Sequence, residues 1–191
     1  MKPPVKTLAL LTIFFFSINT AGAQIKFASA NTIAADVKKV IDDYPNHFDN
    51  ILGSVIIQNP QSTDYQCNFK VSGAEESVIT RYTGKRNTIS SWQALMLTTD
   101  NFQKAKNKFR SLYGQLNDLS KETMYLKGVY ESPVEEKKFT SVIFSFDPTN
   151  ESISKLRVEL IIEAEGMEWK VKVLVYDHER DDDERGDVSG N

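Results

Sequence analysis

The clearest pattern of hydrophobic and polar positions lies between Lys155 and Tyr176. Apolar residues alternate with polar ones before Gly166, and a second alternation follows that glycine. A period of two on both sides of a Glu-Gly break predicts an antiparallel hairpin with one apolar face. The other face carries Glu and Lys side chains, which we expect to pair across the strands. Because an apolar sheet face has to be covered, the rest of the chain is expected to build a layer over it. The apolar positions are Leu156, Val158, Leu160, Ile162, Ala164, Trp169, Val171, Val173 and Val175.

Two further segments show the spacing of amphipathic helices. The first starts after Asn31, which can cap it, and ends at Pro45. The second begins near Asp100, which together with Gln103 resembles a capping box. Its outer face is basic, and we expect a solvated face there, with docking of an acidic partner or of phospholipid head groups as the alternative. The apolar positions are Ile33, Val37, Val40, Ile41 and Tyr44 in the first segment and Phe102, Ala105, Phe109, Leu112, Leu116 and Leu119 in the second, where the basic residues are Lys104, Lys106, Lys108 and Arg110.

Short strands bounded by turn residues account for most of the remaining chain. The sequence therefore predicts an α+β fold, with two helices packed on an antiparallel sheet of about eight strands. The order is also that of a tandem αββββ pseudo-repeat, with halves at 31–98 and 99–177 that each end on a strand opened by a tryptophan, Trp92 or Trp169. One continuous sheet is the alternative. Besides the hairpin, strands are expected at 54–58, 65–72, 77–83, 91–97, 123–131 and 139–146.

The N-terminus predicts a secretory signal peptide. Lys2 and Lys6 form a short basic region, and residues 8–16 are almost wholly apolar. Small residues at 21–23 form a cleavage site, so residues 1–23 are expected to be removed after Ala23. Because the apolar run is too short to span a bilayer, no membrane span is expected after cleavage. The protein is then periplasmic or secreted, with one α+β domain at 24–180 and a disordered acidic tail at 181–191.

The charge of the chain argues against nucleic acid as a partner. The formal net charge is −3, and loss of Lys2 and Lys6 takes it to −5. A mildly acidic protein lacks the basic surface that binds nucleic acid. The four acidic residues Asp181 to Glu184 are consecutive, so their side chains diverge, and we expect neither a metal site nor a cofactor.

No catalytic residue is expected, because the chain lacks the motifs that hydrolases, metalloproteases and phosphate-binding loops require. Cys67 is the single cysteine, which excludes an intramolecular disulfide, and we expect it to be buried in a strand. The alternatives are an intermolecular disulfide and a nucleophile oriented by His47, although nothing in the sequence brings Cys67 and His47 together. Glu159 and Glu163 lie about 13 Å apart on one strand face, which is too far for a glycosidase pair.

Several large apolar residues are expected on the face of the sheet that the helices leave open. A second, partly aromatic sheet face would be a surface for a protein partner or a ligand. The alternative is that loops bury the sheet on this side as well. Strict alternation along the strands places on this face Tyr125, Phe144, Phe146, Leu174 and Tyr176.

The chain resembles uncharacterised exported proteins of Bacteroidota-type bacteria. The likeness rests on the signal peptide, the Ala-Gly-Ala-Gln junction and the segment 139–187, and it extends over roughly residues 36–187. The order of helices and strands is also distantly similar to that of exported binding proteins of the β-lactamase-inhibitor type. This second likeness concerns topology, so it implies a fold and no functional residue.

A non-enzymatic binding module, which engages a protein partner through the open sheet face, is the function that the sequence favours. This expectation rests on the missing catalytic motifs and on the apolar residues of that face. The first alternative is a periplasmic carrier of a hydrophobic small molecule, held between the helices and the sheet. The second alternative is an enzyme that uses Cys67 and His47.

Overall fold

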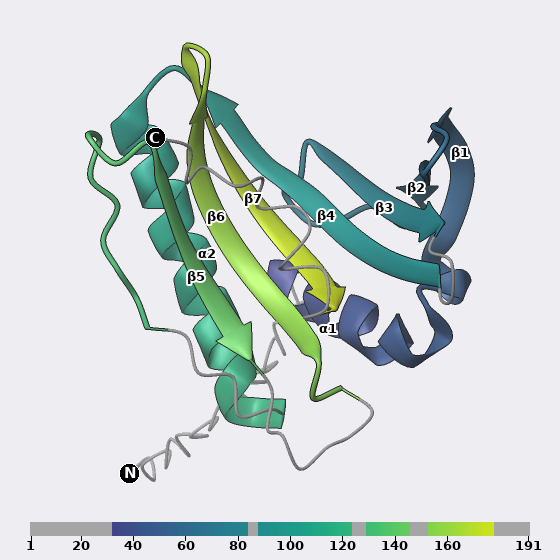
Figure 1. Cartoon of the computed structure of the whole chain (residues 1–191). Helices are drawn as coiled ribbons and strands as arrows, with labels where there is room; N and C mark the ends of the chain where they lie inside the picture. The colour runs from purple at the N-terminus through teal and green to yellow at the C-terminus, as the bar shows by residue number, and fades with distance from the viewer. Residues whose placement is uncertain (1–31, 84–87, 124–128, 146–152, 178–191) are drawn as a thin grey trace, which may run out of the picture. The chain divides into compact units, whose positions relative to one another are not determined.

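The computed structural model describes residues 32–83, 88–123, 129–145 and 153–177. These residues form two helices and a seven-stranded antiparallel sheet, so the predicted α+β fold is confirmed (Figure 1). The strand order is β1-β2-β3-β4-β7-β6-β5. The bounds are α1 Ile33–Asp43, β1 Leu52–Gln58, β2 Ser62–Cys67, β3 Glu76–Thr83, β4 Thr88–Thr99, α2 Phe102–Thr123, β5 Phe139–Ser145, β6 Leu156–Glu165 and β7 Glu168–Asp177.

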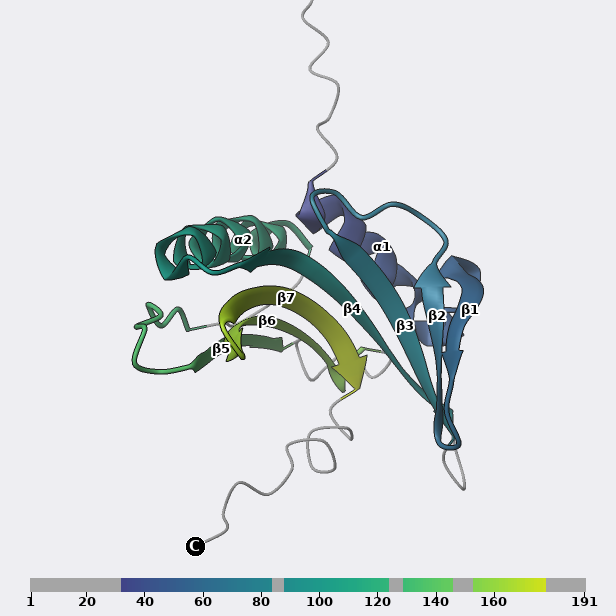
Figure 2. The ribbon, with the colours of Figure 1, turned by 90° about the horizontal axis from the view of Figure 1, so that it is seen from above.

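Both helices pack on the same face of the sheet, as Figure 2 shows. Helix α2 contacts β4, β6 and β7, and α1 contacts α2 and β7. The apolar positions of β6 and β7 face these helices, and Leu160 and Val173 are fully buried there. From α2, Phe109 and Leu116 fill the space above them and are also fully buried. The core therefore lies between the helices and the apolar face of the predicted hairpin.

Strands β4 and β7 join the two halves of the chain inside one sheet. Four strands follow α1, and three strands follow α2 among the residues that the structure describes. In the pairing of β4 with β7, Trp92 lies opposite Val175, and Trp169 lies opposite Thr99. The two tryptophans thus occupy opposite ends of the central strand pair. Duplication of one ancestral half stays a prediction.

Each helix is capped one residue later than its sequence suggests. At α1 the side chain of Thr32, and not Asn31, accepts a hydrogen bond from the backbone N–H of Ala35 at 3.3 Å. At α2 the Oδ1 of Asn101, and not Asp100, accepts from the N–H of Lys104 at 2.9 Å. Both residues are good N-caps, and they satisfy backbone donors that the helix itself leaves unpaired.

Two predicted strands differ from the structure. Strand β2 ends at Cys67 and does not continue to Ser72. Asn68 is no longer part of a strand, and its backbone N–H donates to the carbonyl of Ile51, just before β1, at 2.9 Å. The strand expected at 123–131 is wrong at both ends, since α2 runs to Thr123 and residues 129–131 are not in a strand. Its middle, 124–128, lies outside the described residues.

The predicted signal peptide at 1–23 and the predicted tail at 181–191 also lie outside the described residues. Within the part of the chain that the structure describes, no helix is long and apolar enough to cross a membrane.

Candidate functional site

The open sheet face is not assembled as predicted, because Phe144 belongs to the core. Its side chain is fully buried, and its ring stacks on that of Tyr113 of α2 with 5.8 Å between centroids. Phe144 pairs with Val158 across β5 and β6, and both residues face the helices. The sequence does not decide which alternate residues of β5 face the helices, since the adjacent residues Ile143 and Phe144 are both apolar. The assignment of Phe144 to a partner face is therefore wrong.

Leu174 and Tyr176 do lie on the face away from the helices, because they alternate with the buried valines of β7. Leu174 is half-buried. Tyr176 is buried, and its hydroxyl donates to Oε2 of the buried Glu159 at 2.8 Å. Neither residue is strongly exposed in the structure, while Tyr125 and Phe146 lie outside the described residues. The five predicted partner residues therefore do not form an exposed patch among the described residues.

The same face carries a network of ion pairs nearer the β6–β7 turn. Lys172 Nζ donates to Glu163 Oε1 at 2.5 Å and to Glu165 Oε1 at 2.7 Å, and Lys170 donates to Glu165 as well. Hydrogen bonds from Lys170 and Lys172 lower the pKa of Glu165 to about 2. Burial opposes the charge on Lys172, but its bonds to Glu163 and Glu165 outweigh this effect and raise its pKa. The predicted pairing of Glu and Lys across the hairpin is confirmed, and this part of the face is charged.

Exposed aliphatic side chains gather instead on β1. Val55, Ile56 and Ile57 are 56%, 45% and 52% exposed, and every residue from Ser54 to Gln58 is exposed. Among the described residues β1 has β2 as its only neighbour, so its outer edge is open. The opposite edge strand, β5, instead buries every second residue. Three consecutive exposed aliphatic residues on an edge strand are unusual, because edges are normally protected by charges or proline.

The irregular backbone of β1 explains this exposure. Its register with β2 shifts twice, between Leu52 and Val55 and again between Val55 and Ile57. Because each shift places an extra residue in β1, the alternation of side chains along it is interrupted. A side chain at Gly53 would place its Cβ 2.5 Å from the Gln66 carbonyl oxygen, so only glycine allows this close approach. The aliphatic residues consequently project from both faces of the strand.

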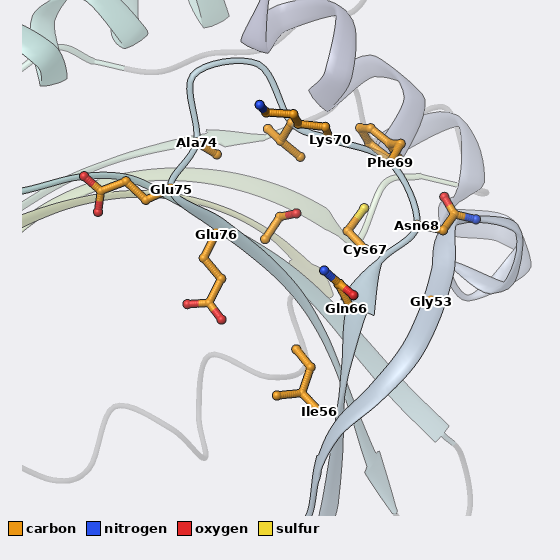
Figure 3. Close-up of a pocket in the computed structure, with 12 residues that line it drawn as sticks. Gly53, Ile56, Gln66, Cys67, Asn68, Phe69, Lys70, Ala74, Glu75 and Glu76 are labelled. Atoms are coloured by element: carbon orange, nitrogen blue, oxygen red, sulfur yellow. The ribbon is translucent and has the colours of Figure 1, made fainter.

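A cavity of about 730 Å³ adjoins β1. Its walls come from β1, the end of β2 and the segment 68–77, as Figure 3 shows. Ile56, Phe69 and Val71 contribute apolar surface, while Lys70 and Glu75 add charged groups. The volume falls in the range of small-molecule sites, about 300–1,000 Å³.

The segment 68–77 is held in place at three points, so the cavity is preformed. Asn68 Nδ2 donates to the carbonyl of Asn50 at 2.8 Å, and the N–H of Glu75 donates to the carbonyl of Leu95 at 2.7 Å. Between them, the N–H of Ser72 donates to Oδ2 of the buried Asp36 at 2.7 Å. Burial opposes the charge on Asp36, but bonds from Ser72 and from Lys39 outweigh it, and the pKa of Asp36 lies below its ordinary value.

Cys67 and His47 do not form a catalytic pair in this structure. Cys67 is buried at the end of β2, as predicted, whereas His47 lies on an exposed turn with a left-handed backbone, φ 54°. No hydrogen bond joins the two side chains in the residues that the structure covers. Within the same residues, no group of three or more His, Cys, Asp or Glu side chains could hold a metal ion. The acidic run from Asp181 to Glu184 lies outside them.

Sequence reasoning predicted the strand at 54–58 but missed its importance. The signal was present, because residues 52–58 contain three adjacent aliphatic residues and neither charge nor proline. A run of this kind is equally typical of a buried central strand. Only the strand order, which depends on pairing far along the chain, identifies β1 as an edge.

A comparison of the chain with protein-family models, with characterised proteins and with solved structures gives no match. The resemblances drawn from the sequence therefore stay predictions.

Proposed function

We propose that the protein is an exported, non-enzymatic binding module that takes up an extended segment of a partner polypeptide along β1. The observation that carries this proposal is the exposure of Val55, Ile56 and Ile57 on an open sheet edge. An edge strand offers backbone N–H and C=O groups to an incoming strand, and its side chains add apolar contact. In this mode the backbone supplies affinity, and the alternating side chains supply specificity.

The chemistry of β1 defines the partner segment. Because residues 52–58 carry no charge, they should bind an uncharged segment most favourably. β-branched or aromatic residues in that segment suit a pleated strand. The hairpin end of β1 and β2 extends away from both helices, as Figures 1 and 2 show. Neither helix therefore stands in the way of a strand that is added beside β1 at this end of the edge.

Export is part of the proposal and rests on the predicted signal peptide at 1–23. The expected product in the periplasm or the medium is a chain that begins at Gln24. Its intact mass, measured after osmotic-shock fractionation of a bacterial host, tests this step. Recovery of the full 191-residue chain from the cytoplasm alone would contradict it.

Selection from a library of displayed random peptides tests the strand-addition mode. Enriched peptides are expected to bind the original chain and to lose at least tenfold in affinity for Ile56→Lys, because a Lys in the middle of the three aliphatic residues of β1 opposes apolar pairing. The matched control is Met167→Lys, which also replaces an exposed aliphatic residue, 93% exposed in the β6–β7 turn. That variant should bind as well as the original.

Backbone methylation separates strand addition from general hydrophobic adhesion. A peptide methylated at every second amide nitrogen, on the edge that faces β1, loses the hydrogen bonds that a strand needs. Its affinity should fall at least tenfold, whereas methylation of the other amides should have little effect. Equal affinities for both methylated forms would exclude strand addition.

A second candidate function is the carriage of a hydrophobic small molecule, which the cavity beside β1 favours. The expected site is this cavity, at the end of β2, and not the space between the helices and the sheet, which is filled by side chains such as Phe109 and Leu116. Native mass spectrometry of the protein from its own host tests the idea. A carrier should retain a bound mass that a Val71→Trp variant, which fills the cavity, fails to retain.

A further inference from the structure

Three buried polar atoms on β3 and β4 have no hydrogen-bond partner among the described residues. They are Nε of Arg81, Oγ of Ser90 and Nε1 of Trp92. Trp92 is fully buried, and Ser90 is 6% exposed. Arg81 is partly exposed, but its Nε has almost no accessible surface. We infer that an ordered water molecule is bound by these three groups, beneath the turn that leads from α1 towards β1. This site does not depend on what β1 binds.

The pairing of β3 with β4 places the three side chains on one face of two neighbouring strands. Arg81 lies directly opposite Ser90, and Trp92 follows two residues later on β4. Residues two apart on a strand point to the same face, so Trp92 shares this face with the other two. Directly opposite residues have Cβ atoms about 4.5–5.5 Å apart. Diagonal neighbours such as Arg81 and Trp92 are about 7–8 Å apart, within reach of long and aromatic side chains. One small molecule can therefore contact all three groups.

This face is the one that the helices cover, because Trp92 belongs to the hydrophobic core. Nη2 of Arg81 donates to the carbonyl of His47 at 3.4 Å and pairs with the carboxylate of Asp49. The turn 47–49 is thus tied to β3 by one end of the guanidinium group. Phe48, in the middle of this turn, is fully buried. The turn therefore closes the site from above, while Nε of the same guanidinium group is left without an acceptor.

A water molecule supplies the hydrogen bonds that these atoms need. Burial of a polar group without a hydrogen bond is unfavourable, and native interiors contain few such groups. A water oxygen can accept from Arg81 Nε and from Trp92 Nε1, and the water can donate to Ser90 Oγ. It then makes about three hydrogen bonds, which is the usual number for a buried water.

The charges around the site favour a neutral ligand over an anion. The guanidinium group of Arg81 already pairs with the carboxylate of Asp49. The register of β4 with β7, continued by two residues, places Asp177 opposite Ser90. The carboxylate of Asp177 accepts from the hydroxyl of Tyr44 at 2.6 Å. Two carboxylates thus lie near a single guanidinium group, and an anion bound between them would be repelled.

The stability of Ser90→Ala tests the inference by its sign. If a water joins the three groups, loss of the hydroxyl removes a hydrogen bond, and the midpoint of urea unfolding should fall. If the hydroxyl is buried without a partner, its removal relieves an unpaired polar group, and the midpoint should rise. Ser141→Ala is the control for the change in strand propensity, since Ser141 is half-buried on the other face of the sheet, in β5. The fall for Ser90→Ala should exceed any fall for Ser141→Ala.

Nuclear magnetic resonance detects the water in the original chain. The chain has two tryptophans, so two indole N–H signals are expected, and Trp169→Phe assigns them. The indole proton of Trp92 should show cross-relaxation with water, with the sign of a water that tumbles with the protein. The signal should persist in Ser90→Ala, because Arg81 and Trp92 still hold the water and no serine hydroxyl is left to relay it.

Three results would overturn the inference. One is the absence of this cross-relaxation in the original chain, or its loss in Ser90→Ala. Another is a Ser90→Ala variant that is as stable as the original chain or more stable. The third is a rise in the urea midpoint when chloride replaces acetate at constant ionic strength, which would assign the site to an anion.

Discussion

Single residues of β1 determine where it packs closely on β2 and where its side chains are exposed. Gly53 lets β1 approach the backbone of Gln66 more closely than any side chain would permit. The same strand leaves Ile56 nearly half exposed a few residues later. Neither property is visible from composition, because each depends on the register between β1 and β2.

Replacement of Gly53 by alanine should destabilise the fold, because the new Cβ would lie 2.5 Å from a backbone oxygen that cannot move aside alone. Overpacking of this kind costs about 1–3 kcal/mol. Gly114→Ala is the matched control, since Gly114 lies in α2 with no atom within 4 Å of an added Cβ. It should stabilise the protein by about 0.5–1 kcal/mol. Urea unfolding of both variants measures these changes, and equal effects would contradict the close packing of β1 on β2.

The ion pairs of Glu165 should stabilise the protein in a defined pH window. The pKa of Glu165 falls from 4.5 to about 2 on folding, so its contribution is present above about pH 4.5 and is lost as the pH falls towards 2. Glu165→Gln should therefore lower the melting temperature at pH 7 but leave it almost unchanged at pH 2. Glu168→Gln, at an exposed neighbouring position, should have little effect at either pH. A constant difference between Glu165→Gln and the original chain across this range would contradict the pairing.

Among the helices and strands, the sequence predicted correctly those elements whose form is determined by residues close together in the chain. The β6–β7 hairpin was predicted correctly because both strands and their turn are adjacent in the chain, and every second residue from Leu156 to Ala164 and from Trp169 to Val175 is apolar. Both helices were predicted from their apolar spacing, with caps misplaced by one residue. The buried face of β5 was predicted wrongly. Ile143 and Phe144 are both apolar, and only the pairing of β5 with β6 shows which of the two faces the helices.

Because Phe144 faces the helices and Phe139 does not, replacing each by alanine should change stability by very different amounts. Phe144→Ala should cost about 3–5 kcal/mol of stability, because it removes a fully buried ring that packs on Tyr113. Phe139→Ala in the same strand should cost less than about 1 kcal/mol, because Phe139 is 51% exposed. Chemical denaturation compares the two variants. A larger loss for Phe139→Ala would mean that the strand presents the other face to the helices.

At the scale of the whole described fold, the strand order creates the candidate site. The two strands that end each half, β4 and β7, meet at the centre and are covered by α2, while β1 is left at one edge. Sequence patterns report which residues are apolar, but they do not report which strand lies at an edge of the sheet, with a neighbour on one side among the described residues. For this reason the sequence favoured aromatic residues on the open sheet face, and the structure directs attention to aliphatic residues on β1. The cavity at the end of β2 was missed for a related reason, since its walls come from segments that only the fold brings together.

Amide hydrogen exchange along β1 measures directly whether a bound peptide adds a strand to this edge of the sheet. Dilute protein is compared with and without a saturating concentration of a peptide selected for binding. Amides in Leu52–Gln58 should exchange at least tenfold more slowly when the peptide is bound, while amides in the middle of α2 should exchange at an unchanged rate. Peptide binding that leaves β1 unprotected, or that protects only the segment 68–77 beside the cavity, would contradict strand addition at this edge.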